Sequence, residues 1–67
     1  MEVLGTTSSL RQAKRLMDEI ASSGHWVASR MGGHSVVYTK GGEEMCILKQ
    51  DSRAWKIVKS QKGETLE

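Results

Sequence analysis

The fold is decided by residues 25–49, which read HWVASRMGGHSVVYTKGGEEMCILK. Two Gly-Gly pairs, Gly32-Gly33 and Gly41-Gly42, divide this stretch into short runs rich in β-branched and aromatic residues. Glycine pairs between such runs are typical of the two-residue turns of β-hairpins. The stretch therefore predicts three antiparallel strands, over residues 25–31, 34–40 and 43–50.

The two turns also set a register, in which Met31 pairs with His34 and Lys40 pairs with Glu43. Since side chains alternate between the two faces of a sheet, one face is expected to carry Val27, Ser29, Met31, His34, Val36, Tyr38, Met45, Ile47 and Lys49. The other face is expected to carry Trp26, Ala28, Arg30, Ser35, Val37, Thr39, Glu44, Cys46 and Leu48. Both faces hold apolar residues, and one helix covers only one of them. A second helix, a dimer partner or a ligand is expected on the other face.

An amphipathic helix is predicted before the strands, over residues 8–23. Apolar residues from Leu10 to Ala21 recur at helical spacing on one arc. Ser9 stands three residues before Gln12, which is the spacing of a capping box. Gly24 is expected to end the helix as the residue after the C-cap.

The segment 51–62 allows two interpretations. Asp51-Ser52 can close a third hairpin that leads into Trp55-Lys56-Ile57-Val58, or Asp51 can cap a second helix. The β-branched and aromatic residues favour the strand. The expected fold class is α+β, with one N-terminal helix packed on a three- to four-stranded antiparallel meander, in the order α-β-β-β-β or, as the alternative, α-β-β-β-α. One small domain is expected over 1–67, with a loose leader at 1–7, the helix at 8–23, the sheet at 25–59 and a flexible tail at 60–67.

Composition limits the class of protein. A chain of 67 residues with 37% hydrophobic residues suits one small domain. It contains no apolar run of the roughly 20 residues that cross a bilayer, so no membrane partner is expected. The net charge of +2 permits nucleic acid as a partner without requiring it. The single Cys46 excludes an intramolecular disulfide and indicates a reducing compartment, so a cytoplasmic location is expected.

The sequence predicts no metal site and no cofactor. His25, His34 and Cys46 lack the short spacings that bring metal ligands together. The Gly-Gly pairs open strands and not helices, so they do not form a phosphate loop. Cys46 has no base on its expected face, which favours a small hydrophobic core residue over a nucleophile.

His34 is the candidate catalytic residue. It is expected to begin a strand directly after a turn, with Lys49 opposite it. A neighbouring ammonium favours the neutral imidazole, which can act as a general base, while Lys49 stabilises a developing oxyanion. This pair would suit metal-independent cleavage of RNA. The alternative interpretation is that His34 is ordinary polar surface.

A basic segment follows. The candidate nucleic-acid-binding residues are Arg30, Arg53, Trp55, Lys56 and Lys59, and Arg11, Lys14 and Arg15 would extend the same surface. Trp55 is either a stacking platform for bases or a core residue. The lysines are alternatively edge-strand residues that block strand addition. On the second face, Trp26 and Arg30 are the candidate contacts for a protein partner or a homodimer.

Several short segments resemble the HicA (YcfA-like) toxins over about half of the chain. They are Leu16-Met17-Asp18-Glu19-Ile20, Ser23-Gly24-His25-Trp26-Val27, Arg30-Met31-Gly32-Gly33-His34-Ser35-Val36-Val37-Tyr38 and Gly41-Gly42-Glu43-Glu44-Met45. The resemblance implies a double-stranded-RNA-binding-like fold with a second helix, and an mRNA interferase whose catalytic histidine is His34. Gly33 stands where the family usually has Ser, and the chain has no Pro, which the family usually carries after the third strand.

The function expected first is that of a small non-enzymatic binding module, which uses an exposed sheet face and basic residues. RNA or another nucleic acid is the favoured partner. The alternative is a HicA-like metal-independent mRNA interferase, with an antitoxin as its protein partner. A second alternative is a protein inhibitor of a host enzyme, of the kind that mobile elements encode.

Overall fold

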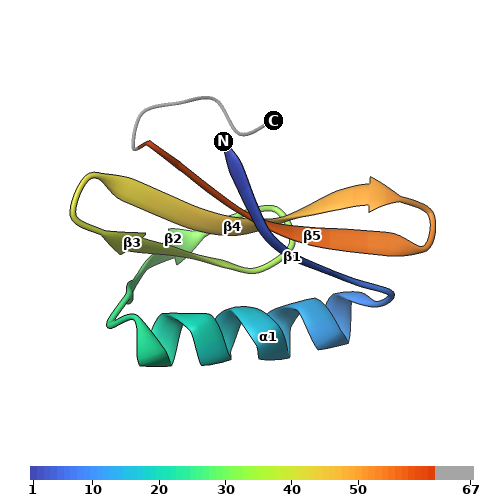
Figure 1. The fold of residues 1–67 in the computed structure, drawn as a ribbon, viewed down its shortest axis with the longest axis horizontal. Helices are drawn as coiled ribbons and strands as arrows, with labels where there is room; N and C mark the ends of the chain where they lie inside the picture. Colours follow the sequence, from blue (N-terminus) through green and yellow to red (C-terminus); the bar gives the residue numbers. More distant parts are fainter. Residues whose placement is uncertain (62–67) are drawn as a thin grey trace.

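The computed structural model describes residues 1–61, which form one α-helix against one face of a five-stranded antiparallel sheet (Figure 1). The elements are β1 (Glu2–Thr7), α1 (Leu10–Ser23), β2 (Val27–Met31), β3 (Val36–Lys40), β4 (Glu43–Asp51) and β5 (Ala54–Gln61). The strand order in the sheet is β1-β5-β4-β3-β2. The α+β class and the antiparallel meander are confirmed, and a strand that the sequence analysis did not expect is added before the helix. The described helix is not long and apolar enough to cross a membrane.

Helix α1 begins where its predicted cap stands. The Ser9 hydroxyl accepts a 3.1 Å hydrogen bond from the backbone N–H of Gln12. At the other end, His25 has a φ of 60°, and the Trp26 N–H donates to the Ala21 carbonyl at 2.9 Å. The residue in the left-handed conformation after the cap is therefore His25 and not Gly24. Gly24 has another role, because a Cβ there would lie 2.9 Å from the Trp26 ring.

Residues 2–7, expected to belong to a loose leader, form the edge strand β1. This strand pairs antiparallel with β5, from Glu2 opposite Lys59 to Thr7 opposite Trp55. The sequence signal was missed because the segment is short, has no alternation and contains Gly5. Its order comes from β5, which offers an otherwise unpaired edge, and from close contact with the helix.

The segment that allowed two interpretations is a strand. β5 pairs with β4 across a tight turn in which the Asp51 carboxylate accepts a 2.8 Å hydrogen bond from the N–H of Arg53. The α-β-β-β-α alternative is therefore wrong, and the second helix that the HicA resemblance implies at this place is absent from residues 1–61. Ser60 and Gln61, expected in the tail, end β5, while residues 62–67 of that tail lie outside the described residues.

The two glycine turns differ. Lys40 pairs with Glu43 across Gly41-Gly42, as predicted, and Gly41 has a φ of 61°. Met31, however, pairs with Val36 and not with His34, so residues 32–35 form a longer loop closed by a 2.7 Å bond from the Gly32 N–H to the Ser35 carbonyl. An irregularity between Ala28 and Arg30 completes the change of register. The predicted register places Arg30 opposite Ser35 and Ala28 opposite Val37, whereas in the structure Arg30 lies opposite Val37 and Ala28 opposite Tyr38.

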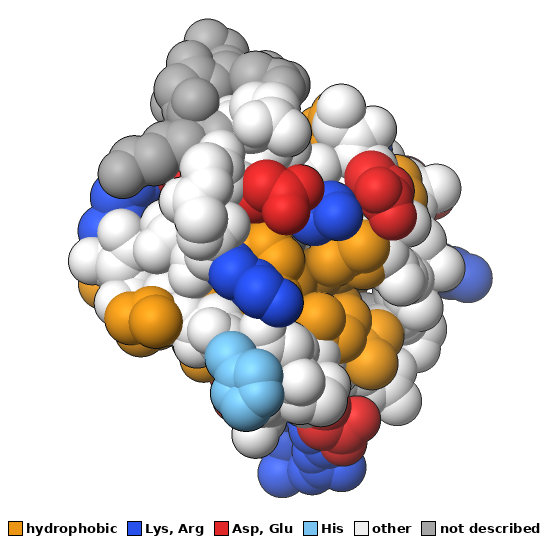
Figure 2. Space-filling view, turned by 60° about the vertical axis from the view of Figure 1, so that its left-hand side comes forward, with side chains coloured by type: hydrophobic (Ala, Val, Ile, Leu, Met, Phe, Trp, Pro, Cys, Tyr) orange, Lys and Arg blue, Asp and Glu red, His pale blue; other side chains and the backbone are white. Residues whose placement is uncertain are grey.

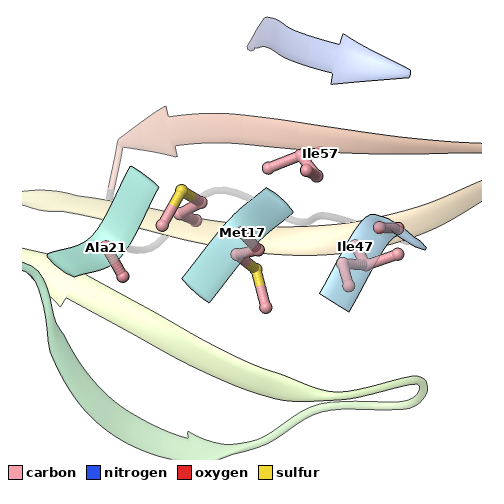
Figure 3. Packing of buried hydrophobic residues seen from close by; sticks show 6 residues of the cluster. Met17, Ala21, Ile47 and Ile57 are labelled. Atoms are coloured by element: carbon pink, nitrogen blue, oxygen red, sulfur yellow. The ribbon is translucent and has the colours of Figure 1, made fainter. Parts of the chain in front are cut away.

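The core lies between α1 and the sheet. Figure 3 shows Met17 and Ala21 of the helix against Ile47 and Ile57 of the sheet, and these four residues are at most 4% exposed. Burying a side chain of the size of Met17 or Ile57 stabilises the fold by about 1.5–3 kcal/mol. Tyr38 and Met45, which pair in the predicted register, belong to or pack against the same cluster. The helix therefore covers the face that carries Tyr38, Met45 and Ile47.

The second face is not the open apolar surface that the sequence analysis expected. Its apolar side chains Val37, Cys46 and Val58 are 0–8% exposed and form a second cluster, with Leu48 packed against it. The large apolar residues that are exposed lie instead at the chain start and in the edge strands: Met1, Val3, Val27 and Met31. The exposed large apolar side chains therefore lie at the edges of the sheet and not on its second face.

Candidate nucleic-acid interface

Three of the predicted site residues meet at one end of the sheet, around the ring of Trp55. The His34 ring stands edge-on to the Trp55 ring, with 4.9 Å between centroids and 80° between planes. The Lys49 Nζ lies 5.7 Å from the centroid of the same ring, which is within cation–π distance. The imidazole of His34 and the ammonium group of Lys49 therefore lie close to the same aromatic ring.

Tertiary structure holds Trp55 in place. In the sheet it lies between Lys49 of β4 and Thr7 of β1. It also packs against the main core cluster, as does Leu10 from the first turn of α1. The ring thus packs against the core and is also contacted by His34 and Lys49. Trp55 is therefore a core residue that also reaches the surface, and its role as a stacking platform for bases stays a prediction.

His34 and Lys49 do not form the cross-strand pair that the sequence analysis expected. Lys49 pairs with Trp55, and His34 lies in the loop before β3 and not at the first position of a strand. The difference follows from the longer β2–β3 loop, which carries His34 past the end of β3. The two side chains are instead related through the ring that both of them contact.

The charges at this end are predominantly positive. Arg11 and Lys14 come from the first turns of α1, and Lys49 and Arg53 come from the β4–β5 hairpin; we call these four residues, together with His34 and Trp55, the basic end. Within residues 1–61 none of these four cations forms an ion pair. Asp51, the carboxylate of the hairpin, already accepts the Arg53 N–H. Figure 1 shows that α1 begins at the same end of the molecule as the β4–β5 turn.

The other end of the molecule carries mixed charge. Lys59 lies 3.3 Å from a Glu43 oxygen and 3.7 Å from a Glu2 oxygen. Its hydrogen bond to Glu43, together with the charges of Glu2 and Glu43, raises the pKa of Lys59 above its ordinary value. Figure 2, which brings this end forward, shows acidic and basic side chains next to one another and to hydrophobic surface. Lys59, a candidate nucleic-acid contact, therefore has its charge balanced locally and lies away from Trp55.

The remaining candidates occupy other places. Arg30 reaches across the second face to Glu44, whose carboxylate it contacts at 3.1 Å. Trp26, expected on that face, packs instead against the helix-side core, because the irregularity in β2 and the helix ending turn its side chain toward α1. Lys56 lies in β5 opposite Leu48 and Thr6, on the second face, and is half-buried.

The remaining questions are whether Cys46 can act as a nucleophile and whether residues 1–61 contain a group of metal ligands. Burial, with a further contribution from the charge of Glu44, raises the pKa of the Cys46 thiol, although Arg30 opposes this effect. The thiol is thereby kept in its protonated, weakly nucleophilic form. Residues 1–61 contain no group of three His, Cys, Asp or Glu side chains arranged to hold a metal ion.

Sequence reasoning did not find that the cations separate by end. The basic residues of 49–62 form one run in the sequence, yet β5 carries Lys59 to the opposite end from Arg53. The i,i+3 spacing of Arg11 and Lys14 on the exposed face of the helix was visible in the sequence, but not that the helix starts at the same end of the molecule as the β4–β5 turn. Comparison with protein-family models, curated proteins and solved structures finds no match to this chain.

Proposed function

We propose that this protein is a small non-enzymatic module that binds RNA through its basic end. The observation that carries the proposal is the gathering of Lys49 and His34 around Trp55, at an end where Arg11, Lys14 and Arg53 also stand without carboxylate partners among the described residues. Exposed lysine and arginine side chains bind phosphates and release counterions, which makes affinity strongly salt-dependent.

The anchored ring supports this function physically. Lys49 loses less conformational freedom on binding if its ammonium already rests near the Trp55 ring, so less of the binding energy is lost in ordering the side chain. In the β4–β5 turn the Asp51 carboxylate accepts a hydrogen bond from the backbone N–H of Arg53, which holds the backbone that carries Arg53. The basic end is thus partly organised before any ligand arrives.

The test compares equal charge changes at the two ends of the molecule. Binding of a fluorescent mixed-sequence RNA is followed by anisotropy over a salt series, for the parent protein and for Lys49→Glu, Arg53→Glu and Lys40→Glu. Lys40 is exposed at the β3–β4 turn, so its reversal is the matched control. We expect reversal of Lys49 or Arg53 to weaken binding by about tenfold and to reduce the salt slope by about 1–2, while Lys40→Glu changes affinity by about twofold or less.

Equal effects of all three charge reversals would show that RNA binding depends only on the net charge of the protein. That result would overturn the assignment of the RNA-binding site to the basic end. Absence of salt-sensitive binding by the parent protein would overturn the function itself. In that case the exposed apolar residues of the sheet edges, Val27 and Met31, would become the place to look for a protein partner.

A second candidate function is metal-independent cleavage of RNA, and one observation favours it: His34 and Lys49 contact the same ring. An exposed imidazole there would act as the base that takes a 2′-hydroxyl proton, and Lys49 would stabilise the negative charge on the phosphorus-bound oxygens. The HicA resemblance places its catalytic histidine at this same residue.

The two histidines of the chain provide the matched pair that separates cleavage from binding. RNA is incubated in EDTA with the parent, His34→Ala or His25→Ala, where His25 is exposed at the far end of the helix. A binding module leaves the RNA intact in all three samples. Cleavage by the parent and by His25→Ala, but not by His34→Ala, with 2′,3′-cyclic phosphate ends, would replace the binding proposal by the enzymatic one.

A further inference from the structure

Strand β2 is the most exposed strand of the sheet. All five of its residues are exposed, and β3 is its one neighbour in the sheet within residues 1–61. Helix α1 packs mainly against β1, β4 and β5. The outer edge of β2, with its backbone N–H and C=O groups, is therefore open in a single copy of the chain.

The composition of β2 does not prevent another strand from pairing with it. Edge strands are usually protected by lysine, proline or an unbalanced charge. The sequence of β2 is VASRM, and its one charged residue, Arg30, lies 3.1 Å from a Glu44 oxygen, so its charge is balanced within the same copy. Val27 and Met31, at the two ends of the strand, are 65% and 74% exposed. The irregularity between Ala28 and Arg30 limits the length of any pairing but leaves the edge free.

The side chains of β2 match a second copy of the same strand. Ala28 pairs with Tyr38, and Met31 pairs with Val36. Since paired residues share a face of the sheet, as do alternate residues of one strand, Ala28 and Met31 both lie on the face that α1 covers. When two β2 strands pair antiparallel across a two-fold axis, Ala28 lies opposite the partner's Met31, and the axis repeats this contact. A small side chain then meets a large one twice, with no unbalanced charge between them.

We infer that two copies of this chain pair through the free edges of their β2 strands, antiparallel across a two-fold axis, so that two five-stranded sheets become one. Backbone hydrogen bonds hold such an added strand. The assembly closes at two copies, because each β2 has one free edge and the pairing uses both of them. Two strands of five residues form a small interface, so we expect a reversible dimer with a Kd on the order of 10 μM. The inference does not depend on RNA binding at the basic end.

The test is sedimentation velocity of the full-length chain between about 1 μM and about 1 mM, a range that brackets the expected Kd. We expect the mass to rise with concentration from the 7.4 kDa of one chain toward twice that value. Met31→Lys should raise the Kd at least about tenfold, because the ammonium group would lie at the interface beside the partner's Ala28. Val3→Lys is the matched control, since Val3 is an exposed apolar residue of the opposite edge strand, and it should change the Kd by about twofold or less.

Disulfide cross-linking tests the register. The double variant Ala28→Cys, Met31→Cys is oxidised in a Cys46→Ala background, and Ala28→Cys alone in the same background is the control; circular dichroism checks that each is folded. Directly opposed residues of an antiparallel pair have Cα atoms about 4.5–5.5 Å apart, which suits a disulfide. We expect a covalent dimer from the double variant only, because the two copies of residue 28 lie roughly 10 Å apart in this register.

Four outcomes would overturn the inference. A parent chain that stays monomeric over the whole range would leave the β2 edge to a strand of another protein. Larger, open-ended oligomers would mean that β1 of one copy pairs with β2 of the next. Equal effects of Met31→Lys and Val3→Lys would show that association follows net charge and not the β2 edge. Absence of a covalent dimer from the double variant, or its formation by Ala28→Cys alone, would show that the strands do not pair in this way.

Discussion

Tyr38 joins the sheet to the helix through its hydroxyl group, which donates a 2.8 Å hydrogen bond to the Asp18 carboxylate. This hydrogen bond is the largest cause that raises the pKa of Tyr38 above its ordinary value, and burial and the charge of Asp18 act in the same direction. Because the folded pKa is raised, the interaction contributes stability below the unfolded pKa of about 10 and loses it as the pH rises through the folded pKa.

We therefore predict that Asp18→Asn lowers the pH at which Tyr38 ionises. The substitution removes the charge that opposes formation of tyrosinate, and Tyr38 is the one Tyr of the chain, so ultraviolet absorbance of tyrosinate reports this residue alone. Glu19→Gln is the matched control, since Glu19 is its exposed neighbour on the helix. An equal shift in both variants would mean that the net charge of the helix, and not the hydrogen bond, sets the pKa.

His25, the residue after the C-cap of α1, has a left-handed backbone conformation. Its left-handed backbone ends the helix, although glycine adopts that conformation more readily. The glycine of this ending stands one position earlier, where the Trp26 ring leaves no room for a Cβ. The helix ending thus reflects the packing of Trp26 as much as the preference of the backbone.

At the scale of elements, β1 is held against both β5 and α1. Its Gly5 lies so close to the helix that a Cβ there would stand 3.0 Å from Leu16 Cδ2. The crossing of β1 and α1 therefore depends on a residue without a side chain. The rest of the strand is bound through its pairing with β5.

We predict that Gly5→Ala lowers the free energy of unfolding by about 1 kcal/mol or more, because Leu16 must move or β1 must shift outward. Urea denaturation measures the change. Gly33→Ala is the matched control, since a Cβ at Gly33 meets nothing within 4 Å, and its effect should stay within about 0.5 kcal/mol. A neutral or stabilising Gly5→Ala would show that β1 does not pack on α1 in solution.

At the scale of the whole molecule, the two tryptophans lie at opposite ends of one hydrophobic core. Trp26 follows the end of α1 and Trp55 lies near its start, yet both pack against the same cluster. A domain of this size has little core to divide between independent parts. The basic end is therefore expected to be as stable as the rest of the fold.

Unfolding should then be a single cooperative transition, with an enthalpy near its midpoint of about 40–50 kcal/mol. Trp26→Phe leaves Trp55 as the fluorescent reporter, and Trp55→Phe leaves Trp26. In each variant the fluorescence midpoint in denaturant should coincide with the circular dichroism midpoint. An earlier fluorescence change in Trp26→Phe alone would show that the basic end unfolds separately.

The sequence by itself determined the local elements. The capping spacing from Ser9 to Gln12, the apolar arc of α1, the Gly41-Gly42 turn and the β propensity of residues 55–58 are read from neighbouring residues, because helices and tight turns form from short-range interactions. Lys40 opposite Glu43 and the core face of Tyr38, Met45 and Ile47 followed from that turn alone. The candidate site residues His34, Lys49 and Trp55 were also named from the sequence, though His34 and Lys49 were assigned to the wrong direct pairing.

Only the tertiary structure decided the rest, for reasons of distance along the chain. β1 is a strand because β5, some fifty residues later in the chain, leaves an edge for it. The β2–β3 loop is longer than its two glycines require, and the register beside it places Arg30 opposite Val37 and in contact with Glu44 on the second face. The basic end exists because β5 carries Lys59 away to Glu2 and Glu43 while α1 brings Arg11 and Lys14 to the hairpin. Such contacts depend on which elements pack together, and the spacing of neighbouring residues in the sequence does not determine that packing.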